Sequence, residues 1–167
     1  MARDDEFTEF VAARGSALRR TAFLMTGDWH AAEDLTQTAL ARLYVAWPRV
    51  GLGGADAYAR TILARSLIDA GRRFWHRERP TAELIDGPGL DDVVEDRVDL
   101  SRALASLPTN QRIVLVLRFW EDMAVEEVAR VLGVSSGTVK SRTSRALDAL
   151  RSLTATDTAI ARRETQS

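Results

Sequence analysis

The apolar residues of this chain recur with a helical period, and no segment alternates between apolar and polar residues as a strand would. A first apolar run stops at Thr26-Gly27, and Asp28 is placed to cap a second run that is expected to end at Pro48. A loop is then expected at Gly51–Gly54, followed by a third helix over about Ala57 to Arg79. The pattern therefore predicts an all-α fold.

The stretch from Asp122 to Leu150 contains a distinctive pair of helices. Apolar residues at i, i+3, i+4 and i+7 form one face of a short helix, which Gly133 is expected to end. Ser135 or Ser136 can cap the helix that follows. One side of this second helix carries Val139, Thr143, Ala146, Leu147 and Leu150. The opposite side and its flanks carry Thr138, Lys140, Ser141, Arg142, Ser144, Arg145 and Asp148.

This layout is typical of a helix-turn-helix, in which a recognition helix enters the major groove of DNA. Central polar side chains then contact base edges, and flanking cations contact phosphates. The candidate DNA-binding residues are Thr138, Lys140, Ser141, Arg142, Ser144 and Arg145. The alternative is a helical hairpin whose arginines are merely solvated. The helix, glycine, turn, serine and helix in sequence favour the DNA-binding interpretation.

Charge is distributed unevenly along the 167 residues, although the formal net charge is only −1. Six basic residues stand against three acidic ones in Gly54 to Arg79, and eight against five in Leu100 to Leu153. Between them, Pro80 to Asp99 holds one arginine and seven acidic residues. We therefore expect two small DNA-facing helical domains, residues 1–79 and 99–153, joined by an acidic flexible linker, residues 80–98, with a tail at 154–167.

The third predicted helix is rich in cations near two aromatic residues, Phe74 and Trp75. The candidate polyanion contacts on it are Arg60, Arg65, Arg72, Arg73 and His76. Aromatic side chains among cations suit unpaired nucleic acid, because bases stack on rings while cations contact phosphates. A charged, solvated surface helix is the alternative.

Composition argues against several other functions. The chain has no cysteine, so thiol nucleophiles and thiolate metal sites are absent. His30 and His76 stand apart, and no phosphate-binding glycine motif or nucleophile elbow occurs, so we expect neither an enzyme nor a metal or cofactor site. No apolar run approaches the length of a membrane span, and the amino terminus is acidic. We therefore expect a cytoplasmic protein that does not bind membranes.

Two segments resemble the extracytoplasmic-function sigma factors of bacterial RNA polymerase, a group of the sigma-70 family. Leu107-Pro108, Leu117-Arg118 and the run EEVARVLGVSSGTVKSR are similar to their carboxy-terminal region. The segment LMTGDWHAAEDLTQTALARLYVAW is similar to the polymerase-binding part of sigma region 2, whose A-E-D-L-x-Q core matches Ala32–Gln37. The resemblance covers about Phe7 to Arg151, with both halves in the expected order.

The resemblance implies how such a protein works. It would bind the RNA polymerase core at the β′ clamp helices, where Asp34 and Gln37 would dock, and at the β flap. The carboxy-terminal helices would read the −35 promoter element as duplex, while the basic helix and the Gly51 to Asp56 loop would hold unpaired −10 bases. An anti-sigma factor is a further candidate partner. Arg65, where the family usually has asparagine, and Gly71 depart from its pattern, as does Ala124 in place of the usual serine cap.

Two other functions are compatible with a helix-turn-helix. A two-domain transcriptional regulator would need βα alternation or a ligand pocket in its other domain, and the first eighty residues show neither pattern. A sigma-like decoy that binds an anti-sigma protein usually carries an added receiver domain, for which 167 residues leave no room. The sequence favours a sigma factor over both.

Overall fold

The computed structural model describes residues 2–74 and 94–164, and the side chains of 2–70 and 100–155. The described residues contain helices and no strand, so the predicted all-α class is confirmed. The chain forms two compact units, Met1–Asp92 and Val93–Ser167. Most of the predicted acidic linker, and His76, lie outside the described residues.

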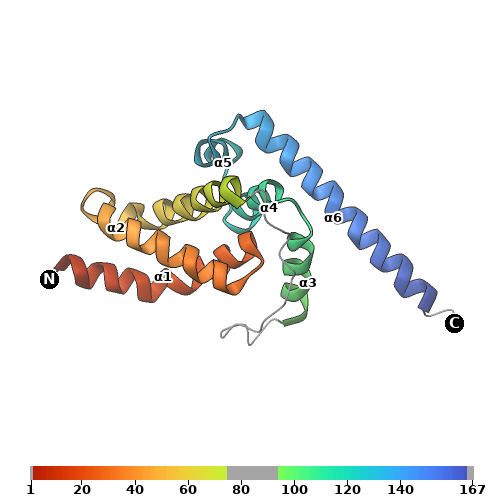
Figure 1. Cartoon of the computed structure of the whole chain (residues 1–167), viewed down its shortest axis with the longest axis horizontal. Coiled ribbons are helices and arrows are strands. Elements are labelled where there is room, and N and C mark those ends of the chain that lie inside the picture. Colours follow the sequence, from red (N-terminus) through yellow and green to blue (C-terminus); the bar gives the residue numbers. More distant parts are fainter. Residues whose placement is uncertain (1, 75–93, 165–167) are drawn as a thin grey trace. The chain divides into compact units, whose positions relative to one another are not determined.

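Unit 1 is built from α1 (Ala2–Thr26) and α2 (Trp29–Phe74), which pack along their lengths (Figure 1). Asp28 caps α2 as expected, since its Oδ1 accepts a hydrogen bond of 2.7 Å from the amide of His30. The core contains Leu18 and Met25 from α1 and Leu43 and Leu63 from α2, all at most 2% exposed. The predicted helical apolar faces therefore meet in one core.

The middle of α2 departs from the sequence prediction. Pro48 lies within the helix, and the backbone leaves helical angles at Gly51 (φ 62°, ψ 176°). The expected loop at Gly51–Gly54 is therefore wrong in extent, because helix resumes directly after one glycine. Figure 1 shows the ribbon of α2 folding back there, so that its halves run side by side. A hydrogen bond of 3.3 Å from Arg42 Nη1 to Ser66 Oγ joins the two halves.

Trp47 of α2 packs against the amino-terminal turns of α1. It is 3% exposed, and its ring meets those of Phe7 and Phe10 at centroid distances of 5.2 and 5.6 Å. Its indole Nε1 donates a hydrogen bond of 2.9 Å to Glu6 Oε2, so the buried N–H is satisfied. The tryptophan that the family resemblance places at a helix end is thus a core residue.

Over its described residues, unit 2 contains five elements: α3 (Val94–Ala105), α4 (Thr109–Leu115), η1 (Val116–Trp120), α5 (Val125–Leu132) and α6 (Ser136–Glu164). η1 is one turn of π-helix that continues α4. The buried residues of this unit include Leu104, Leu107, Ile113, Val114, Leu117, Val128, Val139 and Ala146. These residues come from every element of the unit, so α6 is held by a core shared with α4 and α5.

Candidate nucleic-acid interface

α5 and α6 form the predicted helix-turn-helix. Gly133 ends α5 in the left-handed region (φ 65°), which glycine adopts without steric strain because it has no Cβ. Of the two candidate caps for α6, Ser135 is the one used, because its Oγ accepts a hydrogen bond of 3.1 Å from the amide of Thr138. At the start of α5, Ala124 offers no side-chain cap, and Glu127 Oε2 instead accepts from the Ala124 amide at 3.1 Å.

α6 turns the predicted polar side to solvent. Val139 and Ala146 are fully buried against the unit, and Thr143, Leu147 and Leu150 are half-buried. Four of the candidate DNA-binding residues are exposed: Lys140, Ser141, Ser144 and Arg145. Thr138 and Arg142 are half-buried on the flanks, and the Thr138 hydroxyl lies 2.9 Å from Ser135 Oγ. The structure thus brings the six residues onto the outward half of one helix.

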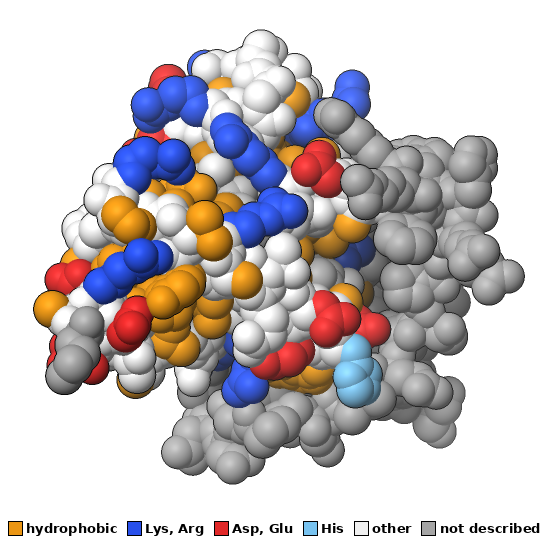
Figure 2. Space-filling view, turned by 60° about the vertical axis from the view of Figure 1, so that its left-hand side comes forward, with side chains coloured by type: hydrophobic (Ala, Val, Ile, Leu, Met, Phe, Trp, Pro, Cys, Tyr) orange, Lys and Arg blue, Asp and Glu red, His pale blue; other side chains and the backbone are white. Residues whose placement is uncertain are grey.

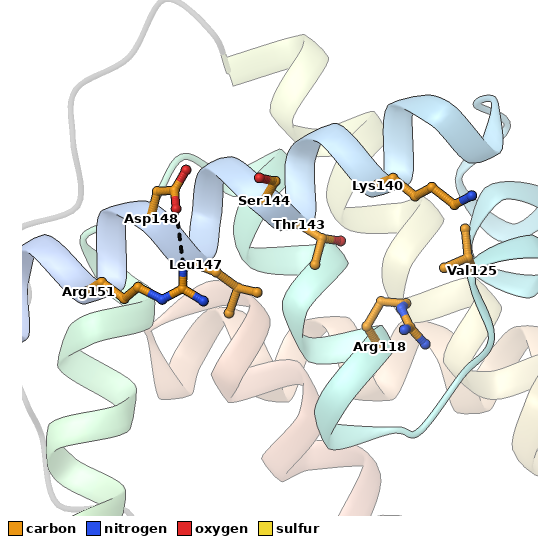
Figure 3. Close-up of a pocket in the computed structure, with 8 residues that line it drawn as sticks. All are labelled: Arg118, Val125, Lys140, Thr143, Ser144, Leu147, Asp148 and Arg151. Atoms are coloured by element: carbon orange, nitrogen blue, oxygen red, sulfur yellow. Dashed lines mark hydrogen bonds and ion pairs between the residues drawn. The ribbon is translucent and has the colours of Figure 1, made fainter.

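A groove runs beside this face of α6. Figure 3 shows six α6 side chains on one wall, with Arg118 of η1 and Val125 of α5 across from them. Arg118 Nη1 donates a hydrogen bond to the carbonyl of Met123, and its guanidinium lies 5.4 Å from the centre of the Phe119 ring. Sequence reasoning did not place Arg118 at the site, because only packing brings η1 beside α6.

The two candidate polymerase-binding residues lie on the first turns of α2. Asp34 and Gln37 are both exposed. Gln37 Nε2 donates a hydrogen bond of 3.1 Å to Glu33 Oε1, and Arg19 Nη1 of α1 lies 3.4 Å from Glu33 Oε2. Both contacts lower the pKa of the Glu33 carboxyl, and the hydrogen bond from Gln37 has the larger effect. Glu33 and Arg19 were not among the predicted site residues.

The candidate −10 residues are only partly described. Arg60 lies 3.4 Å from Asp56, which also accepts two hydrogen bonds from Arg14 at 2.9 and 3.0 Å. Asp56 is thus part of a helix and an ion-pair cluster, not of the expected Gly51 to Asp56 loop. Arg65 is exposed. Arg72 and Arg73 belong to α2, but their side chains, like all of His76, lie outside the described residues.

Basic side chains do not form a single block on the face drawn in Figure 2, where blue Lys and Arg atoms are spread among orange hydrophobic ones. The α6 face is identified instead by its pattern of short polar and cationic residues. Among the described residues, no group of His, Asp and Glu has a metal-binding arrangement. None of the described helices is long and apolar enough to cross a membrane.

Comparison with known proteins matches both units. Residues 10–77 match the family described as sigma-70 region 2, and residues 97–150 match sigma-70, region 4. The RNA polymerase sigma-E factor of Streptomyces coelicolor is 43% identical over 150 residues, which cover 87% of this chain and 84% of that protein. The region 4 match contains α5, the turn and the exposed face of α6.

Solved structures are similar over nearly the whole chain. The sigma factor RpoE in its complex with the anti-sigma factor NepR from Bartonella quintana is 26% identical, with a TM-score of 0.70 over 90% of this chain and 98% of that one. CnrH, in complex with the cytosolic domain of CnrY, is 25% identical, with a TM-score of 0.61 over 90% and 88%.

These matches and the helix-turn-helix geometry show that the chain belongs to the sigma-70 family of RNA polymerase sigma factors, within its extracytoplasmic-function group. It binds core RNA polymerase and directs promoter-specific initiation of transcription. The two-domain regulator considered from sequence does not account for a region 2 match in unit 1.

Proposed function

We propose that the exposed face of α6 reads the −35 promoter element in the major groove. Thr138, Lys140, Ser141, Arg142, Ser144 and Arg145 are the proposed contacts. The observation that carries this assignment is the burial of Val139 and Ala146, which orients short polar and cationic side chains outward on a helix held by α5. Arg145 is the proposed base-reading residue, because arginine pairs bidentately with guanine, and Lys140 is a phosphate contact.

Unit 1 has two proposed roles. Asp34 and Gln37, both exposed at the start of α2, dock on the β′ clamp helices of the polymerase. The basic second half of α2 holds the unpaired −10 bases through Arg60, Arg65, Arg72, Arg73 and His76. Arg60 lies 3.4 Å from Asp56, one turn earlier on α2, so in the free protein part of its charge is offset. The domain boundaries proposed for these roles are 1–79 and 99–153, with residues 80–98 as the linker, whose residues from Val94 onward belong to α3.

Unit 2 is proposed to contact the β flap as well as DNA. Phe119 and Trp120, adjacent at the end of η1, are 59% and 41% exposed, so two aromatic side chains are accessible there to a protein partner. An anti-sigma factor is a further proposed partner, since both similar solved structures are complexes with a second protein. We propose a cytoplasmic protein with no catalytic activity of its own.

In vitro transcription tests this function directly. Core polymerase alone and core polymerase with the full-length protein are compared on a genomic promoter library, and initiation sites are mapped. Initiation at a set of promoters that share −35 and −10 sequences is the expected result. A triple variant, Ser141→Ala, Ser144→Ala and Arg145→Ala, should lose the −35 preference and keep core binding.

A sigma-like decoy is the second candidate function, because it would share both units. A decoy binds an anti-sigma protein and initiates at no promoter. Failure to initiate on any template, together with binding to an anti-sigma protein and no association with core polymerase, would therefore replace the proposed function with the decoy.

A further inference from the structure

Lys140 is the only lysine among the 23 lysine and arginine residues of this sequence. It lies on the exposed face of α6, among the residues proposed to read the −35 element. A lysine amine can be acylated, which removes its positive charge, whereas an arginine guanidinium stays protonated. Among the lysine and arginine residues, only Lys140 can therefore lose its charge by acylation at neutral pH.

The Lys140 side chain is open to a reagent from solvent. Figure 3 shows it extending from α6 toward Val125, at the end of the groove where Arg118 lies. At the other end of the groove, Arg151 Nη1 lies 3.3 Å from Asp148 Oδ1, so the one acidic side chain that lines the groove is already paired. Within the described part of the chain, neither Lys140 nor Arg118 pairs with a carboxylate. No acid therefore engages the ε-amine there.

Arg118 can hold an anion near this amine. Its Nη1 donates to the Met123 carbonyl, and its guanidinium lies 5.4 Å from the centre of the Phe119 ring, so its position is fixed from two sides. Its Nε has no acceptor among the described residues. A guanidinium has five N–H donors in a planar fork, so donors remain for the oxygens of a phosphate group. The exposed Ser144 lines the same groove and adds a hydroxyl donor.

The groove has room for a small molecule that carries both a phosphate and an acyl group. Its volume of about 290 Å³ lies at the lower end of the roughly 300–1,000 Å³ usual for small-molecule sites. Val125 and Leu147 add apolar surface that suits a short acyl chain. In an acyl phosphate, one bridging oxygen joins the phosphate to the acyl carbonyl. A phosphate bound by Arg118 therefore brings the carbonyl toward Lys140 and raises its local concentration there.

We propose that Lys140 is a site of N-acylation by small acyl phosphates, and that Arg118 binds the phosphate group of the reagent. The deprotonated ε-amine attacks the acyl carbonyl carbon. The bond between that carbon and the bridging oxygen breaks, and inorganic phosphate leaves with the bonding electrons. The attacking nitrogen gives its extra proton to water, and a neutral amide remains. The transfer involves no oxidation or reduction.

Acylation of Lys140 regulates promoter binding. This part of the proposal rests on the proposed reading of the −35 element by α6, in which Lys140 contacts a DNA phosphate. The amide has no charge for that contact, so promoter binding weakens by roughly three- to tenfold and the salt slope falls by about one. DNA on the exposed face of α6 covers Lys140 and protects it from the reagent. Occupancy of the −35 element then depends on the supply of acyl phosphate.

Acetylation kinetics test the site in the absence of DNA. The full-length protein is incubated with acetyl phosphate, and peptide mapping by mass spectrometry follows Lys140 separately from the α-amine of the chain. Lys140 should react faster than the lysine of an unstructured peptide spanning Ser136 to Ala146, because the bound phosphate raises the local concentration of the acyl group. Inorganic phosphate should slow the reaction more than chloride at equal ionic strength. Equal rates in protein and peptide, or no competition by phosphate, would overturn the proposal.

Two variants and an uncharged reagent separate anion binding from folding. Arg118→Met should slow acetylation by acetyl phosphate by roughly three- to tenfold, the range for one charge contact. It should leave the rate with uncharged N-hydroxysuccinimidyl acetate unchanged. Arg102→Met, at an exposed arginine of α3, should change neither rate. If Arg118→Met slows both reagents alike or neither, Arg118 does not bind the phosphate and the proposal is wrong. If that variant does not fold, phosphate competition with the parent protein decides.

Promoter binding tests the regulatory part. The protein is acetylated, freed of reagent and assembled with core polymerase. This holoenzyme should bind promoter DNA more weakly than the untreated one, whereas Lys140→Arg, which cannot be acetylated, should bind equally before and after treatment. Unchanged binding after complete acetylation of Lys140 would overturn the regulation. If the untreated holoenzyme shows no −35 preference while acetylation of Lys140 still depends on Arg118, the reading of −35 by α6 fails and the acylation site stands.

Discussion

Gln37 Nε2 donates a hydrogen bond of 3.1 Å to Glu33 Oε1, one turn earlier on α2. This bond uses one of the two amide N–H donors of Gln37, so the other donor and the amide oxygen remain for a partner. The hydrogen bond with Gln37 lowers the pKa of Glu33 from its ordinary value of 4.5, so its carboxylate stays ionised to a more acidic pH than a free one. The bond is therefore present at neutral pH and is lost only as the pH falls through the lowered pKa.

The exposed pair Asp34 and Gln37 is expected to serve binding rather than folding. Replacing both by alanine should weaken association with core polymerase at least tenfold, because two polar contacts of about 1 kcal/mol each are removed. Thermal stability should stay nearly unchanged, since neither side chain is buried. Core affinity by fluorescence anisotropy and melting by circular dichroism measure the two effects. A large fall in melting temperature with normal core binding would contradict the assignment.

Arg145 is expected to read a base. Arg145→Ala should weaken promoter binding by up to roughly a hundredfold and relax preference at one or two −35 positions, because a bidentate arginine–guanine pair is worth about 1–3 kcal/mol. Binding-site selection with the holoenzyme measures the preference. The exposed Arg102, changed to alanine, is the control for loss of one positive charge. Retention of the parent's preference at every −35 position would exclude base reading by Arg145.

Alanine substitutions at Gly51 and Gly53 form a matched test and control for the bend in α2. An added Cβ meets no atom within 4 Å at either position, so only the backbone distinguishes them. The angles of Gly51 lie in a region nearly restricted to glycine, and Gly51→Ala should lower the free energy of unfolding by about 1–3 kcal/mol. Gly53 is helical, so Gly53→Ala should raise it by about 0.5–1 kcal/mol. Urea unfolding measures both, and equal effects would disprove the bend at Gly51.

Arg112 is expected to be a structural cation. It is 9% exposed, and its Nη2 donates to the carbonyls of Leu107 at 3.0 Å and Ala105 at 3.3 Å, where α3 joins α4. Arg112→Met should destabilise unit 2 by about 1–3 kcal/mol, since these carbonyls lose a charged donor. Hydrogen exchange of α4 peptides localises the loss. The exposed Arg102→Met should change it little, and equal protection in both variants would show that the Arg112 contacts add no stability.

α2 follows its local sequence signals at its start and along its apolar faces, but not in its middle. Apolar spacing identified its faces, and Asp28 identified its start, because capping and periodicity depend on residues a few positions apart. Pro48 and three nearby glycines were interpreted as a helix end and a loop, since each disfavours helix locally. Packing of both halves of α2 against α1 outweighs that preference, and only Gly51 needs a non-helical backbone.

The sequence by itself determined the all-α class, the helix-turn-helix with its αL glycine, and which side of α6 is polar, because these follow from local spacing and backbone chemistry. The structure added the local details that Ser135 caps α6 and that Glu33 engages Gln37. Only the tertiary structure decided that Trp47 packs on Phe10, that Arg14 pairs with Asp56, and that Arg118 stands beside Lys140. The last of these joins residues more than twenty positions apart. Such neighbours are set by how helices pack around a shared core, which no local pattern specifies.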